Sequence, residues 1–502
     1  MGKNLRISEK ICVPINSKEV NMGLMKPEEY KSMVQKMKVN AYLNGKKVEN
    51  LLENPVTRSV VEATAKLYEL ALEPKHEGIM TARSHLTGEK ISRNLHVNRS
   101  TEDLEKRADM ALLTSQTLGT CNYRCVGCDA LNALASVMVE IDRARGTEYG
   151  QRFRAYLQWI QGKDLAVSGA VTDAKGNRAK RILEGDPDMY VHVVQRKPDG
   201  IVVRGAKLHQ SGAFAAHETV VIPGGALRKG EEDYAVAFAV PNSARGITYI
   251  LQYNPLSAER EQAEDIYHLG NPQFGQRETC LMVFEDVFVP NERVFMCGEV
   301  EFAGSLIQRF AKTHRMNCGG ACKVGFADII IGATQLAAEY AGTEKASHIR
   351  EAITHMVRIS EASHACAIAA AVKGKEEPPG SGVYMPDDLF GNVAKISTAH
   401  GFWQIMALAG DVAGGLVVTL PSFQELKNPA TEKYVEKYLK AAVPAEKRMR
   451  ITKVLQNWTA GLHGPGTWHG AGSTQAQMIS LQRAANLEEK KRIAKKIAGI
   501  ED

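Results

Sequence analysis

Five of the nine cysteines in this chain lie in two short segments that are far apart in the sequence. The first is Cys121-Asn-Tyr-Arg-Cys125-Val-Gly-Cys128, and the second is His314-Arg-Met-Asn-Cys318-Gly-Gly-Ala-Cys322-Lys323. Thiolate sulfur and imidazole nitrogen are ligands that suit zinc or iron–sulfur centres. If the fold brings the two segments together, the chain holds a metal centre.

The first segment alone leaves three interpretations open. Cys-x3-Cys-x2-Cys is the spacing of radical S-adenosylmethionine enzymes, in which three thiolates leave one iron open. Those enzymes place the motif after the first strand of a βα-repeat barrel, whereas here it lies between helical patterns. A structural zinc site that includes Cys125 and Cys128 is a second interpretation. Buried, inert cysteines are the third, because a free cysteine packs as a small apolar side chain.

The second segment adds a histidine to the candidate ligands. His314, Cys318 and Cys322 are each four residues apart, so they would share one face of an unbroken helix. Gly319 and Gly320 argue against such a helix and predict a tight turn or a close backbone approach. A histidine followed so closely by Gly-Gly-Ala-Cys-Lys is a candidate ligand.

Composition excludes several classes of function. A chain of 502 residues has room for two or three domains or for one multilayered unit. The net charge of +6 is small, and basic residues alternate with acidic ones, so the concentrated basic surface of a nucleic-acid-binding protein is not expected. An anionic small-molecule ligand is compatible with this charge.

The ends and apolar runs of the chain predict a cytoplasmic protein with no membrane segment. Residues 1–10 lack the apolar stretch of a secretory signal, and the best apolar run, 405–420, is interrupted by Asp411 and three glycines. Thiols stay reduced in the cytoplasm, so closely spaced cysteines indicate metal ligands or catalytic groups before they indicate disulfides.

Hydrophobic periodicity predicts an α+β fold in three parts. Helical spacing is clear in residues 60–71 and 131–141, and the first cysteine segment lies near a helix start. Short β-branched runs with Gly, Pro and Asn between them extend from about 186 to 300 and predict an antiparallel β-domain. Helical patterns then continue to the end, where the lysine-rich tail is expected to be a solvated helix. We therefore expect an N-terminal helical domain (1–160), a middle β-domain (161–300) and a C-terminal helical bundle (301–502).

Several separated motifs, in order, resemble one family. They are Cys121-Asn-Tyr-Arg-Cys125-Val-Gly, Val203-Arg-Gly-Ala-Lys-Leu-His-Gln-Ser-Gly, Arg309-Phe-Ala-Lys-Thr-His-Arg, Gly320-Ala-Cys-Lys-Val-Gly and His469-Gly-Ala-Gly-Ser-Thr-Gln-Ala-Gln. Together they resemble the 4-hydroxybutyryl-CoA dehydratases, which combine FAD and a [4Fe–4S] cluster on an acyl-CoA dehydrogenase-like fold. The resemblance extends from about residue 25 to the end of the chain.

The resemblance implies the ligands of the cluster: Cys121, Cys125, Cys322 and His314. Cys128 is not among them, which weakens the radical S-adenosylmethionine interpretation. The histidine has a chemical rationale, because a more weakly held iron can bind a substrate hydroxyl and act as a Lewis acid. A released imidazole can serve as a base near neutral pH.

The resemblance also implies flavin contacts and two further site residues. The candidate flavin contacts are Thr172, Arg178, Gln210, Ser211, Gly414 and Gly415, each of which could equally be a turn or cap residue. Glu278 matches an acid near the family's active site, with an exposed turn glutamate as the alternative. Lys323 is a candidate for binding the acyl-CoA or stabilising enolate charge, with a solvated lysine as the alternative.

Four departures from the family pattern bear on these assignments. The family has one residue fewer between the histidine and the final cysteine, a tyrosine where Cys318 stands and a glutamine where Tyr123 stands. It also has a glutamate just before His469, where this chain has Gly466-Thr-Trp. Cys318 therefore competes with Cys322 as the third thiolate.

The implied function is a lyase that converts 4-hydroxybutyryl-CoA to crotonyl-CoA by a flavin radical route with the cluster iron as Lewis acid. Isomerisation of vinylacetyl-CoA is the expected side activity. The implied enzyme is a homotetramer with an acyl-CoA substrate and no nucleic-acid or membrane partner. The alternatives are a flavin-dependent hydroxylase of the 4-hydroxyphenylacetate type, a radical S-adenosylmethionine enzyme, and a non-enzymatic protein in which the cluster is a structural brace.

Overall fold

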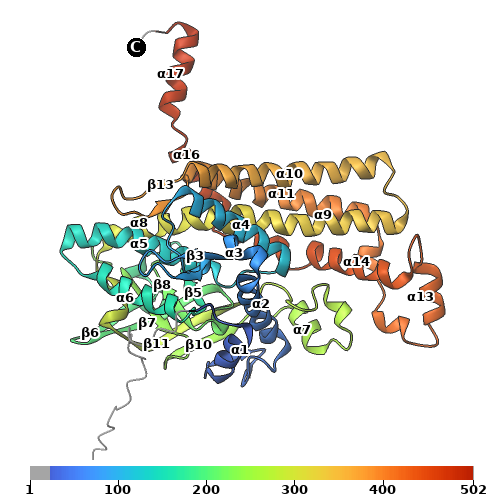
Figure 1. The fold of residues 1–502 in the computed structure, drawn as a ribbon, viewed down its shortest axis with the longest axis horizontal. Coiled ribbons are helices and arrows are strands. Elements are labelled where there is room, and N and C mark those ends of the chain that lie inside the picture. Colours follow the sequence, from blue (N-terminus) through green and yellow to red (C-terminus); the bar gives the residue numbers. More distant parts are fainter. Residues whose placement is uncertain (1–22, 501–502) are drawn as a thin grey trace, which may run out of the picture. The chain divides into compact units, whose positions relative to one another are not determined.

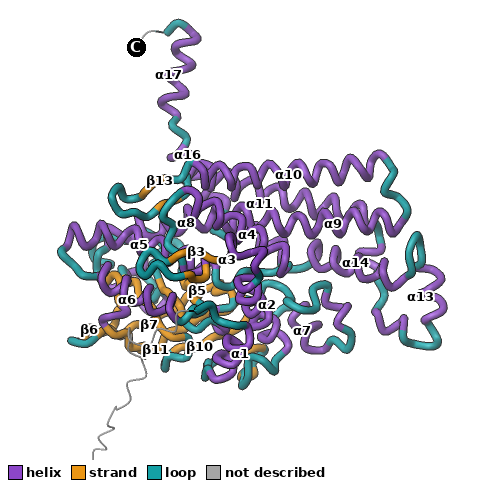
Figure 2. Tube along the Cα trace, viewed as in Figure 1, coloured by secondary structure: helices purple, strands orange, loops and turns teal. Residues whose placement is uncertain are grey.

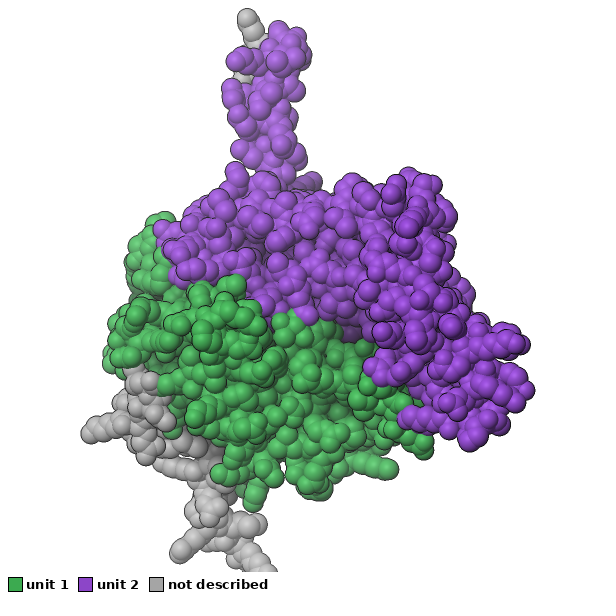
Figure 3. Space-filling view, turned by 45° about the vertical axis from the view of Figure 1, so that its right-hand side comes forward, with its two compact units in different colours: residues 1–99, 117–310, 376–383 green, residues 100–116, 311–375, 384–502 purple. Residues whose placement is uncertain are grey.

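Figure 1 shows the protein as a computed structural model that describes residues 23–500, so the N-terminal segment 1–10 lies outside the described residues. The chain divides into two compact units, which Figure 3 colours separately. Unit 1 is Met1–Arg99, Thr117–Phe310 and Glu376–Val383, and unit 2 is Ser100–Gln116, Ala311–Lys375 and Tyr384–Asp502. Each unit therefore combines segments that are distant in the sequence.

Unit 1 is built on a six-stranded sheet of order β2-β1-β10-β11-β7-β6 and a four-stranded sheet of order β12-β9-β8-β5. The strands are β1 Ala41–Leu43, β2 Lys46–Lys47, β5 Val167–Ala170, β6 His192–Lys197, β7 Gly200–Ser211, β8 Glu218–Val221, β9 Val236–Pro241, β10 Ile247–Leu251, β11 Thr279–Pro290 and β12 Val294–Cys297. A separate hairpin pairs β3 (Thr81–Arg83) with β4 (Lys90–Ser92). The predicted β-region is confirmed as mainly antiparallel, but the pairs β1–β10 and β5–β8 are parallel.

The helices of unit 1 bring the first cysteine segment onto the smaller sheet. They are α1 Pro27–Lys36, α2 Pro55–Leu72, α3 Glu77–Met80, α5 Cys125–Arg145, α6 Tyr149–Gly162 and α7 Pro255–Gln262. Helix α5 lies directly on β5, because a Cβ at Gly127 would be 2.1 Å from the Val167 carbonyl oxygen and one at Gly169 would be 2.8 Å from the Val126 oxygen. Glycine at both positions permits this approach and sets the position of Cys125, the first residue of α5.

Unit 2 is helical (Figure 2). Its helices are α9 Cys322–Ala341, α10 Ser347–Val372, α11 Asp388–Ala413, α12 Leu416–Thr419, α13 Glu432–Leu439, α14 Ala445–Ala460, α15 His463–His469, α16 Thr474–Ala484 and α17 Leu487–Ala498. Helices α4 (Thr101–Leu118) and α8 (Val300–His314), and the short strands β13 (Lys375–Glu376) and β14 (Tyr384–Met385), occur where the chain passes between the units. Phe326, Met356, Phe402 and Leu455 form part of an apolar core that joins α9, α10, α11 and α14. Helix α17 has no buried residue, as expected for a solvated tail.

One helical run, Val300–Ala341, is long and apolar enough to cross a membrane by length and composition. The sequence-based expectation differs, since it places the best apolar run at 405–420 and expects none long enough to span a membrane. In the structure 56% of the most apolar window of the run 300–341 is buried inside the protein. Core helices of globular proteins share these properties, so the run is weak support for a membrane span.

Candidate active site

The link between α4 and α5 holds the first cysteine segment in a fixed turn. Asn122 accepts a hydrogen bond from the Arg124 N–H at 3.0 Å through its side chain, and from the Cys125 N–H at 3.2 Å through its carbonyl oxygen. The Arg124 side chain is buried, donates to Asp164 Oδ1 at 3.1 Å and lies over the Tyr68 ring at 4.5 Å. The turn between Cys121 and Cys125 is thus fixed by a buried ion pair.

The three cysteines of this segment have different surroundings. Cys121 is buried in the link, and Cys125 is partly exposed at the start of α5. Cys128 is fully buried one turn later, with its Sγ 3.7 Å from the Arg93 carbonyl oxygen. This packing supports the interpretation of Cys128 as a structural thiol.

Tyr123 lies between the candidate ligands Cys121 and Cys125 in the chain. It contacts Gln276 and Glu278, which come just before strand β11 of the six-stranded sheet. Its hydroxyl donates to the Gln276 carbonyl oxygen at 3.2 Å and accepts from the Glu278 N–H at 3.3 Å. Its ring lies against Gly212, where a Cβ would be 2.4 Å from Tyr123 Cδ1. Burial, with the neighbouring Cys121 and Glu278 as smaller contributions, raises the pKa of Tyr123 well above its ordinary value, so the hydroxyl stays protonated.

Glu278 is buried beside this tyrosine and is only 3% exposed, so the alternative of an exposed turn glutamate is wrong. Burial raises its pKa to about 7, against smaller lowering effects of the Gln252 amide and the Arg260 charge. Gln252 Nε2 donates to Glu278 Oε2 at 3.3 Å, while Gln252 Oε1 accepts from the Thr279 hydroxyl at 2.6 Å. A carboxyl group with this pKa can both accept and release a proton at neutral pH.

Two predicted flavin contacts, Gln210 and Ser211, lie at the same end of the sheet as Glu278. They end strand β7 and pair with Cys280 and Thr279 of β11, and the Gly212 N–H donates to the Glu278 carbonyl oxygen at 3.1 Å. Thr172 lies beside β7, and its carbonyl oxygen accepts a hydrogen bond from the Leu208 N–H at 2.8 Å. Unit 1 therefore brings Cys121, Tyr123, Glu278, Gln210 and Ser211 into one cluster.

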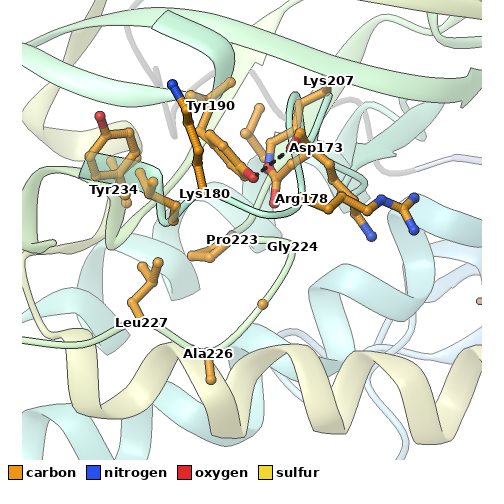
Figure 4. A pocket seen from close by; sticks show the side chains of 16 residues that line it. Asp173, Arg178, Lys180, Tyr190, Lys207, Pro223, Gly224, Ala226, Leu227 and Tyr234 are labelled. Atoms are coloured by element: carbon orange, nitrogen blue, oxygen red, sulfur yellow. Dashed lines mark hydrogen bonds and ion pairs between the residues drawn. The ribbon is translucent and has the colours of Figure 1, made fainter. Parts of the chain in front are cut away.

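Arg178 belongs to a different place in unit 1. It is exposed in the loop 173–181 and lines a cavity of about 270 Å³ (Figure 4).

Gly414 and Gly415 lie in unit 2, where Gly414 has φ +69° just after the end of α11 and both glycines are exposed. The Gly414 N–H donates to the Gly410 carbonyl oxygen at 3.1 Å and so closes the end of α11, which is the simpler explanation for this glycine.

The second cysteine segment, in unit 2, forms a helical junction. Helix α8 ends at His314, residues Arg315–Ala321 form a π-helical turn, and α9 begins at Cys322. The predicted tight turn is wrong, but the predicted close approach is confirmed: a Cβ at Gly320 would be 2.9 Å from the Ala367 Cβ. A π-helix closes i→i+5 hydrogen bonds and so holds one more residue per turn than an α-helix. The single α-helical face expected for the three ligand candidates therefore does not hold.

Lys323 is buried beside Cys318, so the alternative of a solvated lysine is wrong. Its Nζ is 3.8 Å from Cys318 Sγ and 5.0 Å from the centre of the Phe326 ring. This contact does not decide between Cys318 and Cys322, so the assignment of Cys322 as the third thiolate stays a prediction. Thr398 on α11 donates to the Gly319 carbonyl oxygen at 2.6 Å and helps to hold the π-helical turn.

The four implied cluster ligands divide between the units: Cys121 and Cys125 belong to unit 1, and His314 and Cys322 to unit 2. Within residues 23–500, no group of three or more His, Cys, Asp and Glu side chains forms a metal site. The cysteines of these segments are free thiols rather than disulfides. The donor types suit iron–sulfur chemistry, and their assignment as ligands stays a prediction.

Residues 26–296 match the family described as 4-hydroxyphenylacetate 3-hydroxylase N terminal, and residues 303–499 match its C-terminal counterpart. The chain is 40% identical over 493 residues to the 4-hydroxybutyryl-CoA dehydratase/vinylacetyl-CoA-Delta-isomerase of Clostridium aminobutyricum, which covers 95% of this chain and 100% of that protein. The chain belongs to the 4-hydroxybutyryl-CoA dehydratase family.

Solved structures agree with this membership. The oxygen-tolerant archaeal 4-hydroxybutyryl-CoA dehydratase of N. maritimus has a TM-score of 0.92 and 37% identity, with 96% of each chain covered. A variant of the HpaB protein complexed with FAD has a TM-score of 0.84 and 25% identity, with 95% of this chain and 98% of that chain covered. The predicted fold, an acyl-CoA dehydrogenase-like arrangement of helices, β-sheets and helices, is confirmed for this dehydratase-family chain.

Sequence reasoning missed several residues of this dehydratase-family chain. Gln252 and Arg260, which set the surroundings of Glu278, have no local signal, because they reach it only through tertiary contacts. Tyr123 is only a departure from the family pattern in the sequence, and its hydrogen bond with the Glu278 N–H appears only in the structure. Lys175 and Lys180 on either side of Arg178 are a local signal in the sequence, because three basic residues within six positions indicate a positively charged loop.

Proposed function

We propose that this protein is a lyase that dehydrates 4-hydroxybutyryl-CoA to crotonyl-CoA and also isomerises vinylacetyl-CoA to crotonyl-CoA. The observation that carries the proposal is the 40% identity over the full length of a dehydratase/isomerase with both activities in its name. The reaction is difficult because the hydrogen at C3 is not activated, so ordinary acid–base elimination lacks a driving force.

The proposal includes FAD and a [4Fe–4S] cluster held by Cys121, Cys125, His314 and Cys322. It is supported by free thiols in both segments and by the FAD-bound relative of the same fold. Gln210, Ser211 and Thr172 are the proposed flavin contacts in unit 1, with Arg178, Gly414 and Gly415 as the other candidates. When bound, the flavin supplies one-electron chemistry and the cluster iron supplies a Lewis acid for the departing hydroxyl.

The side chains of the chain itself then handle protons and charge. The Glu278 carboxylate accepts the C2 proton, which its pKa of about 7 permits at neutral pH. The buried Lys323 ammonium stabilises the negative charge that develops on the thioester oxygen. The His314 imidazole accepts the C3 proton when it is not coordinated.

The test uses protein purified without oxygen. Flavin, iron and sulfide are counted on one sample, and conversion of 4-hydroxybutyryl-CoA to crotonyl-CoA is followed by mass spectrometry. Cys125→Ser should lose iron and turnover, while the matched Cys128→Ser variant, which changes a thiol in the same segment, should keep both. Wild-type protein with neither flavin nor iron–sulfide would refute the proposal.

The alternatives differ in iron content and in fold. A flavin-dependent hydroxylase, represented by the 4-hydroxyphenylacetate 3-monooxygenase of Thermus thermophilus at 28% identity, needs no cluster. A radical S-adenosylmethionine enzyme needs a βα barrel, which the sheets of residues 23–500 do not form. A non-enzymatic protein would keep iron but not turn over substrate. We further propose a cytoplasmic homotetramer, which light scattering on the purified protein tests.

A further inference from the structure

Helix α11 carries three buried polar side chains that the proposed mechanism does not use. Asn392, Lys395 and Thr398 follow one another at intervals of three residues, so they lie on one side of the helix, and they are 0%, 0% and 5% exposed. Every other buried residue of α11 is a glycine or has an apolar side chain. A buried polar group destabilises a protein unless it is paired, so these three residues, here called the polar stripe, indicate a specific set of contacts.

All three residues of the polar stripe contact the π-helical turn between α8 and α9. Asn392 Oδ1 accepts a hydrogen bond from Arg315 Nη1 at 2.7 Å. The stem of Lys395 lies against Gly319, where a Cβ would be 3.0 Å from both the Cβ and the Cδ of Lys395. The Thr398 hydroxyl donates to the Gly319 carbonyl oxygen at 2.6 Å. The stripe therefore holds the turn at two positions, its first residue and its fifth.

The ammonium group of Lys395 connects the same turn to another helix. Its Nζ donates to the Thr467 carbonyl oxygen at 2.6 Å and to the Trp468 carbonyl oxygen at 3.2 Å, both at the C-terminal end of α15. The last carbonyl groups of a helix have no N–H partner within the helix and form the negative end of its dipole, so a cation is their natural partner. Lys395 thus joins the π-helical turn, through its stem, to the end of α15, through its charge.

We propose that Lys395 is a positioning residue of the iron site, which keeps the π-helical turn where His314 and Cys322 can both bind iron. His314 directly precedes the turn and Cys322 directly follows it, so a change within the turn moves one of these residues relative to the other. The inference rests on the proposed function, because the iron–sulfur cluster belongs to that proposal.

The π-helical turn needs this support because α-helical hydrogen bonding competes with it. π-helices are rare, and the same backbone groups can close α-helical bonds instead. A shift of the pattern by one residue would rotate Cys322 about the helix axis relative to His314 by about 100°, since an α-helix has 3.6 residues per turn. Without the ammonium, the carbonyl oxygens of Thr467 and Trp468 lose a buried donor, and the turn loses its connection to α15.

The first experiment removes the charge of Lys395 and keeps an unbranched stem. Lys395→Met, purified without oxygen, should hold iron about tenfold more weakly against a graded chelator, the lower end of the effect for residues that support metal ligands. The electron paramagnetic resonance spectrum of its reduced cluster should also differ from that of wild type. Met449→Ala is the control on α14: it removes a fully buried apolar side chain outside the stripe and the turn, so it should lower the melting temperature but leave iron retention and spectrum unchanged.

The second experiment examines the turn in full-length protein without iron. Cys318 and Cys322 are each 9% exposed, so their alkylation, followed by mass spectrometry, requires local opening. Lys395→Met should be alkylated at both about tenfold faster than wild type, because one hydrogen bond to a charged group is lost. Cys128 in unit 1 should react as in wild type. Thr398→Val, which removes the hydroxyl bonded to Gly319, should change iron retention and alkylation in the same direction by a smaller factor.

The two experiments separate the possible failures. Wild-type iron retention and alkylation in Lys395→Met overturn the proposal. Met449→Ala that matches Lys395→Met in both measurements overturns it too, because the effect would then come from overall stability. If Lys395→Met does not fold, Thr398→Val decides by the same two measurements. Wild-type protein without iron refutes the proposed cluster and the metal role with it, whereas the alkylation contrast decides separately whether Lys395 holds the turn.

Discussion

At position 278, a carboxyl group is almost fully buried and has one amide donor, Gln252 Nε2, at 3.3 Å. Burial removes the water that would stabilise the charged carboxylate. The hydrogen bond from Gln252 and the positive charge of Arg260 offset only part of this loss. The result is a pKa of about 7. The Tyr123 hydroxyl, two residues from Cys121, accepts a hydrogen bond from the Glu278 N–H. This bond connects the candidate base to the first cysteine segment.

The Glu278→Gln variant should change how stability depends on pH. The pKa of Glu278 is raised on folding from its ordinary value of about 4.5 to about 7, so its contribution to stability is fully present below about pH 4.5 and is lost as pH rises through 7. Wild type should therefore lose about 3 kcal/mol of unfolding free energy relative to the variant between pH 4.5 and 8. Denaturant titrations of both proteins at pH 5 and pH 8 measure this. A difference between them that does not vary with pH would contradict the raised pKa.

The Gln252→Leu variant should raise the pKa of Glu278 further, because the Gln252 hydrogen bond lowers it. If the Glu278 carboxylate is the base, the rise of kcat/KM with pH should move to higher pH. The pH–rate profile in the range 5 to 9 measures the change. Gln335→Leu, which removes a glutamine bonded to Glu339 on the surface of α9, is the control and should leave the profile where it is.

At the scale of elements, glycines set two close approaches that hold the cysteine segments. Gly127 lets the start of α5 lie on β5, and Gly320 lets the π-helical turn lie against α10 and α11. In both places a neighbouring atom occupies the space where a Cβ would stand. The helix starts at Cys125 and Cys322 are therefore positioned by backbone packing and not by the cysteine side chains.

Gly320→Ala should destabilise the protein by about 1–3 kcal/mol, because its Cβ would press on the Ala367 Cβ at 2.9 Å. It should also lower the iron content, since Cys322 is two residues away. Gly332→Ala is the matched control on the same helical run: a Cβ there meets nothing within 4 Å, and alanine favours a helix, so stability should rise by about 0.5–1 kcal/mol. Thermal unfolding and iron analysis of both variants test the contrast. Equal effects at the two positions would show that the close approach does not matter.

At the scale of the whole molecule, the two units each combine distant segments, and the two cysteine segments belong to different units. Chain order therefore does not correspond to the compact units: residues 100–116 join the C-terminal helices, and residues 376–383 join the sheets. A cofactor that binds only the folded chain adds its binding free energy to folding stability.

Removal of iron without oxygen, by a chelator and a reductant, should lower the melting temperature of wild-type protein. Cys125→Ser, which should purify with little iron, should melt near the iron-free wild type and respond little to the chelator. Cys128→Ser should respond as wild type does. Differential scanning calorimetry with iron counts on the same samples measures this. Identical melting with and without iron would count against a cluster bound by the folded chain.

Residue order alone allowed much of this protein to be predicted. The order of helices, strands and helices follows from local hydrophobic periodicity, and the family follows from motifs that stand at fixed distances along the chain. The candidate cysteines and histidine were recognisable because their chemistry belongs to the residue types themselves. None of these inferences needs knowledge of which distant residues meet.

The properties that depend on contacts between distant residues could not be predicted from residue order alone. The π-helical turn at 315–321 replaced an expected tight turn because packing against α10 and α11 favours a wide helical turn over a break at the glycines. The burial of Glu278 and Lys323, the contact of Lys323 with Cys318, and the basic cavity around Arg178 arise from residues far apart in the sequence. A side chain's charge state depends on what surrounds it, and tertiary packing alone sets those surroundings.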